Sequence, residues 1–391
     1  MTKVIFVHRI LSKYREEFFE LLVKEGARRG LDIRIFYCLP RPGPQPAGHD
    51  ERIIRVPPIL SRPVTIGGMR HDVVIPWGLY RRLSAERPDI IVAEDISALP
   101  AGLIVATYGR LTGCPYLIWG LGSVPGKKMS PLKRLFRPLI NYFRNGAAAF
   151  LGYGEYAVRY YGAIYGKPAF AVYNSTVSRQ NIRVSEDDIR ARYLADKPLR
   201  LVFIGRISAQ KRIEKLLEAV RRLDGLDWRL DIIGDGEHLA NLKRFAAEMG
   251  LAERIEFHGA IYDFQRKAEI LTACHLAVMP GLGGLMVQEA YCHGVPVICG
   301  PADGTEQDLV GSTNEDLLLR EATPRELART IDKFAALPLE DKVARAVRCV
   351  DMVREKYNVE NMADSILSAL TSVAASRAEG SSGAPRPTSA H

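Results

Sequence analysis

The sequence predicts an α/β protein with two doubly wound, Rossmann-like domains that face a central cleft. Short apolar runs of strand length alternate with amphipathic helical patterns along almost the whole chain, which is typical of parallel sheets covered by helices. A chain of 391 residues also exceeds what one hydrophobic core usually organises. Sheets of this class bind ligands beyond the carboxyl ends of their strands, so we expect the binding site in the cleft.

The N-terminal domain is predicted over residues 1–180, with a linker over residues 181–198 that contains one short helix at Glu186–Tyr193. The expected strands of this domain are the apolar or β-branched runs that end at turn residues: Val4–Val7, Ile33–Tyr37, Ile90–Val92, Tyr116–Trp119, Ala149–Gly152 and Ala169–Tyr173.

The C-terminal domain is predicted over residues 199–355, with helices at Ile213–Leu223 and Leu239–Met249. We expect a helix over residues 356–374 to complete the N-terminal domain, and the polar composition of residues 375–391 indicates a disordered tail. The expected strands of the C-terminal domain are Leu201–Ile204, Leu230–Ile233, Ile255–Phe257, Leu276–Met279 and Val295–Ile298.

Composition and charge exclude several classes of protein. The chain is 47% hydrophobic and 25% charged, as globular domains are, and its longest apolar runs are far shorter than the roughly 20 residues that span a bilayer. The N-terminus has the pattern of a strand and lacks a signal-peptide cleavage site, so we expect a cytoplasmic protein. Six widely spaced cysteines without a Cys-x-x-Cys pair argue against a zinc site or a disulfide framework. The net charge of +9 favours anionic partners.

A cationic turn follows the first strand of the C-terminal domain. Arg206 comes directly after Gly205 at the strand end, and Lys211 opens the next helix. A guanidinium can bind two phosphate oxygens at once, and a lysine adds a point charge, so both residues can hold a phosphate group at the sheet edge. Taken alone, this pattern favours solvated charges at a helix start, and a second motif is needed to favour a phosphate site.

A glycine-rich loop, Gly283-Gly284-Leu285, leads from another strand into a helix that contains Glu289. Its backbone amides and the helix dipole favour an anion, and its glycines allow the main chain to approach a diphosphate closely. The simpler alternative is a tight strand-to-helix turn. Glu289 has apolar neighbours and therefore needs a partner, for which a ribose diol is one candidate.

Several motifs in the second half of the chain occur in the order seen in a known family. They are Phe-Ile-Gly-Arg206-x4-Lys211, Ile-Ile-Gly234-Asp-Gly236, Ile255-Glu-Phe-His-Gly259 and Gly-Gly-Leu-x3-Glu289-Ala-x3-Gly294-Val-Pro296. This half resembles the family-four retaining glycosyltransferases of the GT-B fold, and the first half resembles them more loosely.

The resemblance implies a hexosyltransferase that uses a nucleotide diphosphate sugar as its donor substrate, with no cofactor and no metal. Arg206 and Lys211 would then stabilise the diphosphate as catalytic residues, Glu289 would bind the ribose, and main chain at Gly259 would receive the base. Gly205, Gly283, Gly284 and Leu285 would complete the substrate-binding set.

Two positions depart from the family pattern. Gly281 stands where the family usually has a second glutamate, and Leu121 stands where it often has a histidine. Both family residues would contact the sugar of the donor. The departures therefore concern the sugar half of the pocket and leave the nucleotide half unchanged.

Three N-terminal residues are weaker candidates. His8 ends the first strand and is either a contact to the acceptor or the donor sugar, or a structural histidine. Glu94 and Asp95 follow another strand, and since adjacent residues of an extended chain point to opposite sides, we expect at least one of them to be solvated.

Residues 127–144 combine six basic residues with apolar and aromatic ones and contain no acidic residue. This pattern is typical of a helix on an anionic membrane surface and equally of a core helix with a basic outer face. We expect peripheral binding at the inner face of the cytoplasmic membrane. No recognised nucleic-acid motif accompanies the charge, so we expect no nucleic-acid partner. The basic residues are Lys127, Lys128, Lys133, Arg134, Arg137 and Arg144.

The sequence therefore predicts a glycosyltransferase that transfers sugar to a saccharide or a lipid-linked saccharide during polysaccharide or glycolipid assembly. Two alternatives remain at this stage: a non-catalytic GT-B scaffold that binds sugar nucleotides, and a sugar-nucleotide epimerase.

Overall fold

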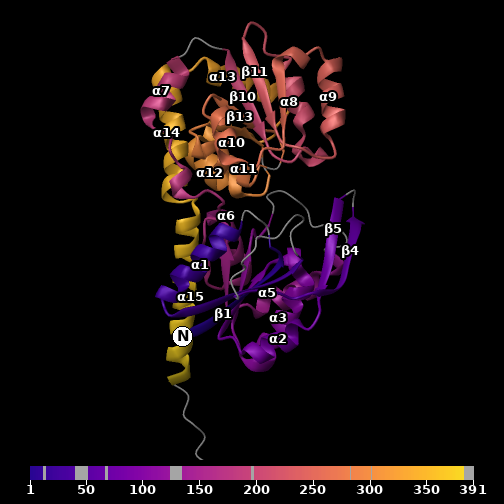
Figure 1. Cartoon of the computed structure of the whole chain (residues 1–391), viewed down its shortest axis with the longest axis vertical. Helices are drawn as coiled ribbons and strands as arrows, with labels where there is room; N and C mark the ends of the chain where they lie inside the picture. Colours follow the sequence, from indigo (N-terminus) through magenta and orange to yellow (C-terminus); the bar gives the residue numbers. More distant parts are fainter. Residues whose placement is uncertain are drawn as a thin grey trace, which may run out of the picture. The chain divides into compact units, whose positions relative to one another are not determined.

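The computed structural model describes residues 1–11, 15–39, 52–66, 69–123, 134–194, 198–281, 283–300 and 302–382. Contacts divide these residues into two units. In Figure 1 the first unit is coloured indigo to magenta, together with the yellow C-terminal helix, and the second runs from magenta through orange to yellow. The N-terminal unit contains the described residues up to Gly122, those from Arg134 to Tyr173, and the chain from Glu360 on. The C-terminal unit contains Asn174–Val359.

The N-terminal unit is built on a parallel sheet with the strand order β3-β2-β1-β6-β7-β8-β9. The strand order reverses beside β1, which has β2 on one side and β6 on the other, so the ligand-binding switch point of a doubly wound sheet lies there. The strands are β1 (Thr2–Ile10), β2 (Leu31–Leu39), β3 (Ile53–Arg55), β6 (Ile90–Glu94), β7 (Tyr116–Gly120), β8 (Ala149–Gly152) and β9 (Ala169–Ala171).

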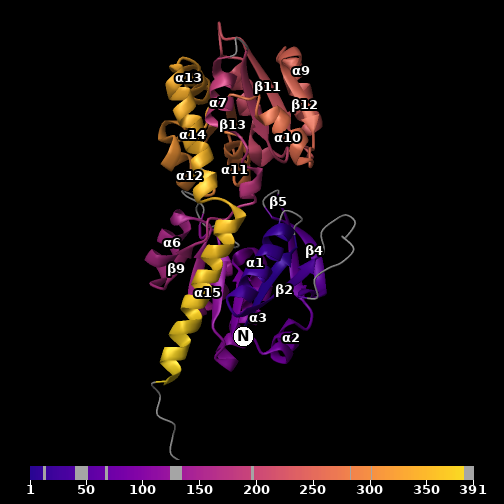
Figure 2. The same cartoon turned by 60° about the vertical axis from the view of Figure 1, so that its left-hand side comes forward.

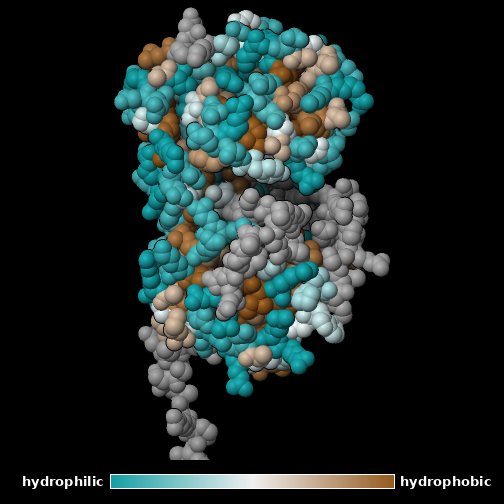
Figure 3. All heavy atoms as spheres, viewed as in Figure 1, coloured by the Kyte–Doolittle hydropathy of each residue, from teal (hydrophilic) through white to brown (hydrophobic). Residues whose placement is uncertain are grey.

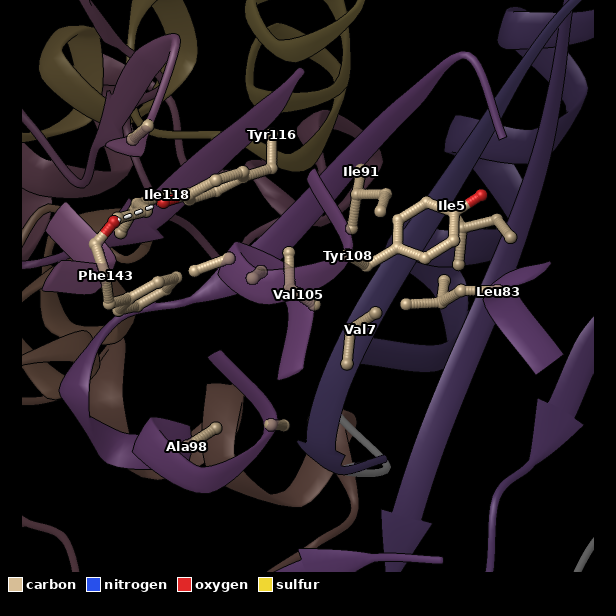
Figure 4. Packing of buried hydrophobic residues seen from close by; sticks show 14 of the residues in the cluster. Ile5, Val7, Leu83, Ile91, Ala98, Val105, Tyr108, Tyr116, Ile118 and Phe143 are labelled. Carbon is tan, nitrogen blue, oxygen red and sulfur yellow. Dashed lines mark hydrogen bonds between the residues drawn. The ribbon is translucent and has the colours of Figure 1, made fainter. Parts of the chain in front are cut away.

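Helices cover both faces of this sheet because alternate side chains of each strand point to opposite faces. Ile5 and Val7 of β1 share one core with α2, α3, α5 and α6, as Figure 4 shows for part of that cluster. Phe6 points to the other face, where its ring lies 6.3 Å from that of Phe19 in α1. The helices are α1 (Glu16–Arg28), α2 (Leu79–Glu86), α3 (Leu99–Thr112), α5 (Arg137–Gly146), α6 (Glu155–Tyr165) and α15 (Val359–Ser382).

The C-terminal unit has a five-stranded parallel sheet with the order β12-β11-β10-β13-β14. All of the strands expected here from the sequence are present. They are β10 (Leu199–Ile204), β11 (Trp228–Ile233), β12 (Ile255–Gly259), β13 (Leu276–Met279) and β14 (Val297–Cys299). The helices are α7 (Glu186–Leu194), α8 (Ile213–Val220), α9 (Leu239–Glu248), α10 (Phe264–Leu271), α11 (Leu285–Cys292), α12 (Thr305–Thr313), α13 (Pro324–Ala335) and α14 (Leu339–Glu355).

The described part of the segment predicted as a linker, residues 181–194 and 198, belongs to the C-terminal unit. Its helix α7 buries Ile189 in an apolar cluster with Val343, Ala346 and Val350 of α14. The first part of the N-terminal unit ends at Tyr173, before the expected boundary at residue 180, and the unit resumes at Glu360.

The C-terminal helix α15 also differs from the expectation. It continues to Ser382, so residues 375–382 are helical where the sequence indicated disorder, and residues 383–391 lie outside the described part. Figures 1 and 2 both show α15 alongside α1, and an ion pair joins Asp364 of α15 to Arg29 at the end of α1.

An antiparallel hairpin in the N-terminal unit was not expected from the sequence. It consists of β4 (Pro58–Ile66) and β5 (Met69–Pro76), which form a two-stranded sheet with no further strand among the described residues. On the face drawn in Figure 3, the described surface is mostly hydrophilic, and hydrophobic side chains reach it in small groups. Within the described residues, no helix has both the length and the apolar character needed to cross a membrane.

Candidate active site

The carboxyl ends of β10, β11 and β12 meet at one edge of the C-terminal sheet. Gly234, after β11, has a φ of +151°, and a Cβ at this position would lie 1.9 Å from the carbonyl oxygen of Gly205. Only glycine allows that approach. The amide of Gly234 also donates to the carbonyl oxygen of Gly259 at 2.8 Å. Three glycines thus bring the predicted phosphate turn next to the predicted base-binding turn.

Arg206 extends from this edge into solvent. Its guanidinium donates to Glu237 Oε2 at 3.0 and 3.2 Å, and the two side chains are 75% and 57% exposed. Exposed ion pairs of this kind contribute about 0 to 1 kcal/mol, so Arg206 can exchange Glu237 for a more strongly charged anion at little cost.

Lys211 is half-buried at the end of a short 3₁₀ helix, Ala209–Lys211, on the same edge. Burial lowers the pKa of Lys211, while the charges of Glu306 and Asp303 act in the opposite direction. The loop after β13 packs directly against this short helix. A Cβ at Gly281 would lie 2.2 Å from the carbonyl oxygen of Gln210, so this backbone leaves no room for the glutamate that the family usually has there.

The amides of Gly283 and Gly284, which we expected to bind the diphosphate, already have an acceptor. Both donate to Glu306 Oε1 at 3.0 Å, and Glu306 Oε2 accepts from the amide of Asp303 at 3.0 Å. The side chain of Glu306 is buried, and burial together with the charge of Asp303 raises its pKa to about 7. Sequence reasoning missed Glu306. No signal in the sequence indicated it, because Glu306 stands among the polar residues Thr305, Gln307 and Asp308 shortly after β14.

Glu289 on α11 has a partner that the sequence did not indicate. Its carboxylate forms an ion pair with Lys267 of α10, and both side chains are only about one-fifth exposed, at 21% and 19%. A carboxylate among apolar side chains needs such a partner, as we expected, but the partner is a lysine of the same unit. Leu285 begins α11 one turn before Glu289.

One group of three side chains in the described residues has the spacing to hold a metal ion: Asp231, Glu256 and His258. Arg200 donates to both carboxylate oxygens of Asp231, at 2.7 and 3.0 Å. A guanidinium in that position opposes a divalent cation, so this group does not fit a metal. Asp231 and Glu256 line a cavity of about 1070 Å³ whose lining contains none of the predicted site residues.

His8, at the end of β1 in the N-terminal unit, is buried and paired. Its Nδ1 lies 2.9 Å from Glu94 Oε1, and its ring packs 5.0 Å from Phe19 and 5.3 Å from Trp119. Its Nε2 is buried without a hydrogen-bond partner among the described residues. The surroundings favour a structural histidine with one unused hydrogen-bonding atom.

Asp95, the neighbour of Glu94, is buried in a second ion pair. Asp95 Oδ1 accepts from Arg144 Nε at 2.8 Å, and Asp95 Oδ2 accepts from the hydroxyl of Tyr161 at 2.8 Å. That hydroxyl in turn accepts from the amide of Gly122, next to Leu121, at 3.0 Å. Asp95 is therefore buried with Arg144, whereas Glu94, whose side chain is 25% exposed, is paired with the ring of His8, so neither carboxylate is simply solvated.

The same ion pair corrects the account of the basic segment. Arg144 is 4% exposed, so it cannot belong to a membrane-facing surface, and Asp95 is the carboxylate that balances it. Arg134 and Arg137 are exposed, whereas Lys127, Lys128 and Lys133 lie outside the described residues.

Two parallel sheets, each with a polar edge at its strand ends, define a two-domain protein of the Rossmann-like class. Two family models match this chain: glycosyl transferases group 1 over residues 185–348, and a glycosyl transferase 4-like domain over residues 16–174. The chain belongs to the group 1 glycosyl transferases, and its fold is that of the GT-B glycosyltransferases. The predicted family and fold class are thereby confirmed.

Named relatives and a solved structure agree with this assignment. The 2-deoxystreptamine glucosyltransferase of Streptomyces kanamyceticus is 34% identical over 34% of this chain and 35% of its own. The GDP-mannose-dependent alpha-(1-6)-phosphatidylinositol monomannoside mannosyltransferase of Mycobacterium tuberculosis is 28% identical over 58% and 62%. The match thus spans less than two thirds of either relative. An Anabaena protein solved with UDP and glucose has a TM-score of 0.67 at 16% identity over 95% of this chain and all of its own.

Proposed function

We propose that this chain is a retaining glycosyltransferase that moves a hexose from a nucleotide diphosphate sugar to a saccharide or lipid-linked saccharide. The main support is the cationic edge of the C-terminal sheet, where Arg206 is exposed and weakly paired beside the half-buried Lys211. Departure of the nucleoside diphosphate is the difficult step, and fixed cations that stabilise the growing charge accelerate it. In this proposal the two cations replace a metal, and no cofactor is needed.

The other roles follow the geometry of the same edge. Glu289 would exchange part of its pairing with Lys267 for the ribose hydroxyls, and main chain at Gly259 would contact the base. Gly205 would allow the backbone turn that leads to Arg206, and Leu285 would lie at the site because it begins α11. The Anabaena structure, of the same fold, contains UDP and glucose, which supports a nucleotide in this class of site.

A panel of nucleotide sugars, with and without a lipid-linked saccharide acceptor, tests the proposal by mass spectrometry of the products. Transfer that needs the acceptor supports a glycosyltransferase. A changed sugar nucleotide without acceptor would indicate an epimerase, and binding without any turnover would indicate a scaffold. The family match and the glycosyltransferase names of the relatives favour the first outcome.

We also propose that the protein binds the anionic inner face of the cytoplasmic membrane through residues at the start of α5. Leu135, Phe136 and Leu139 are 72%, 41% and 42% exposed and lie beside the exposed Arg134 and Arg137. Apolar side chains flanked by cations fit an anionic lipid surface. A lipid-linked acceptor fits the proposal because the mycobacterial relative is named for a phosphatidylinositol mannoside.

Sedimentation with anionic liposomes tests the membrane proposal. Each cation near such a surface contributes about 1 kcal/mol, so the double variant Arg134→Glu/Arg137→Glu should lose most of its binding at low salt. The variant Arg221→Glu/Arg222→Glu makes the same charge change at two exposed arginines of the C-terminal unit and should bind normally. Equal loss in both variants would show nonspecific attraction and remove the docking surface.

A further inference from the structure

A buried carboxylate occupies the glycine-rich loop of the candidate active site. Glu306, in the first turn of α12, accepts hydrogen bonds from three backbone amides, those of Gly283, Gly284 and Asp303, each at 3.0 Å. Its side chain is almost fully buried. Consecutive amides that converge on one point form a site for an anion, and here the protein supplies that anion itself.

The same loop is fixed at its other end by the short helix that carries Lys211. Gly281 packs directly on the backbone of Gln210 and Lys211, with no room for a side chain. The loop after β13 therefore lies between Lys211 at one end and Glu306 at the other. The Glu306 carboxyl is thus joined by direct hydrogen bonds to the amides that precede α11.

We propose that Glu306 is a positioning residue for the sugar donor, which holds the Gly283–Gly284 loop in place and whose charge state sets the strength of diphosphate binding. This inference rests on the proposed function of the same site. It also changes how the site works, because the diphosphate is then bound by Arg206 and Lys211 while the loop amides remain with Glu306.

The charges around Glu306 give the direction of the effect. The charged and titratable groups that act on it are Asp303, Lys211 and the buried thiol of Cys299. Burial and Asp303 raise the pKa of Glu306 to about 7, so the carboxyl is ionised above neutral pH and protonated below it. The ionised form repels a diphosphate and competes for Lys211. A protonated carboxyl still has Oε1 available for both glycine amides, so the loop stays in place while the repulsion is removed.

Titration calorimetry with a nucleotide sugar tests the charge effect between pH 6 and 8. The ligand is a nucleotide sugar that turns over in the donor panel. A nucleotide sugar is suitable because its diphosphate does not itself titrate in this range. We expect wild-type affinity to fall about tenfold as the pH rises, the order for one unit charge at a partly buried site. Glu306→Gln should keep the high affinity at all pH values. Glu315→Gln, an exposed control in the short 3₁₀ helix that follows α12, should behave as wild type.

Kinetics and hydrogen exchange separate positioning from simple folding. Glu306→Gln should lower KM for the sugar donor at pH 8 with little change in kcat, whereas Glu306→Ala should lower kcat and speed amide exchange over residues 283–289 in the unliganded protein. The exchange result does not depend on turnover, so it tests the anchoring role even if no sugar donor reacts and the proposed function fails. A wild-type pH dependence in Glu306→Gln, or normal exchange in Glu306→Ala, would overturn the inference.

Discussion

The two units carry very different ion pairs at the carboxyl ends of their sheets. In the N-terminal unit, the side chains of Arg144 and Asp95 are 5% and 9% exposed, while in the C-terminal unit those of Arg206 and Glu237 are 75% and 57% exposed. The buried pair adds hydrogen bonds to Tyr161 and to the carbonyl oxygen of Gly122. No buried group among the described residues is shown to support the exposed pair in this way.

This difference separates structure from ligand binding. Asp95 raises the pKa of Arg144 in spite of burial, which by itself would lower it, so the cation persists inside the unit and cannot be given to a substrate. A solvated pair such as Arg206–Glu237 loses little when a ligand replaces one partner. We therefore expect substitutions at the first pair to act on stability and substitutions at the second to act on turnover.

The largest effect is expected for Arg144→Met. Removing one partner of a buried ion pair leaves an uncompensated charge and typically costs about 3 to 5 kcal/mol of unfolding free energy. Urea denaturation measures this loss, and Arg206→Met, an identical substitution at an exposed site, should change stability by less than about 0.5 kcal/mol. The double variant Asp95→Leu/Arg144→Met should recover much of the loss. Similar stability losses in both single variants would remove the contrast between the two pairs.

The rate of sugar transfer should be sensitive to substitutions at the exposed cationic edge, where stability should change little. Arg206→Ala and Lys211→Ala should each slow sugar transfer by about 10² to 10³-fold, as for other groups that stabilise a developing negative charge. Arg244 is a matched control, because it is 71% exposed and lies 4.0 Å from a glutamate on a neighbouring helical turn. Arg244→Ala should transfer sugar at the wild-type rate. Near-normal rates in folded Arg206→Ala and Lys211→Ala proteins would contradict the diphosphate assignment.

Glu289 lies between the two extremes, since its pair with Lys267 is partly buried. Glu289→Gln should weaken binding of the nucleoside diphosphate by about 1.5 to 3 kcal/mol, the range for a hydrogen bond to a charged group. Calorimetry with the nucleoside diphosphate and its 2′,3′-dideoxy analogue measures the ribose contribution. Wild-type protein that binds the two ligands equally well would show that Glu289 does not contact the ribose.

The smallest effect is a pH dependence at the His8–Glu94 pair. Burial alone would raise the pKa of Glu94, but its hydrogen bond to His8 and the amide of Arg9 outweigh burial and lower it. A carboxyl with a lowered pKa stabilises the folded state above its ordinary pKa of 4.5, and this stability is lost as the pH falls through the folded value. Urea midpoints between pH 6 and 3 should therefore fall more steeply in wild type than in Glu94→Gln. Parallel curves would show that the pair contributes nothing to acid stability.

The strands of both sheets other than β3 could be predicted because each is a short apolar run that ends at turn residues. The edge strand β3, Ile53–Arg55, was missed because it is only three residues long. The hairpin β4–β5 was missed because Pro58, Pro63 and several charged residues interrupt its pattern. Residues 375–382 were taken for disorder, although Ala375, Arg377 and Glu379 favour a helix that has already begun.

The candidate site was predictable in position but not in pairing. Arg206 directly follows β10, so its place at the sheet edge follows from the strand alone. Its partner Glu237, the partner Lys267 of Glu289, and the contact between Glu306 and the glycine amides join different loops and helices. Such contacts depend on how those elements pack, which local sequence patterns do not specify.

The position of α15 has a consequence for synthesis of the protein. Leu367 of this helix lies against Gly26 of α1, and Met362, Ile366 and Leu370 are fully buried. The ribosome therefore makes residues 174–359 before the helix that covers this face of the first sheet is available. Until then, apolar residues of α1 are exposed on the nascent chain, at a stage when multidomain proteins are prone to aggregate or to bind chaperones. Synthesis of the N-terminal unit begins first, but this unit can be completed only after the C-terminal unit has been synthesised.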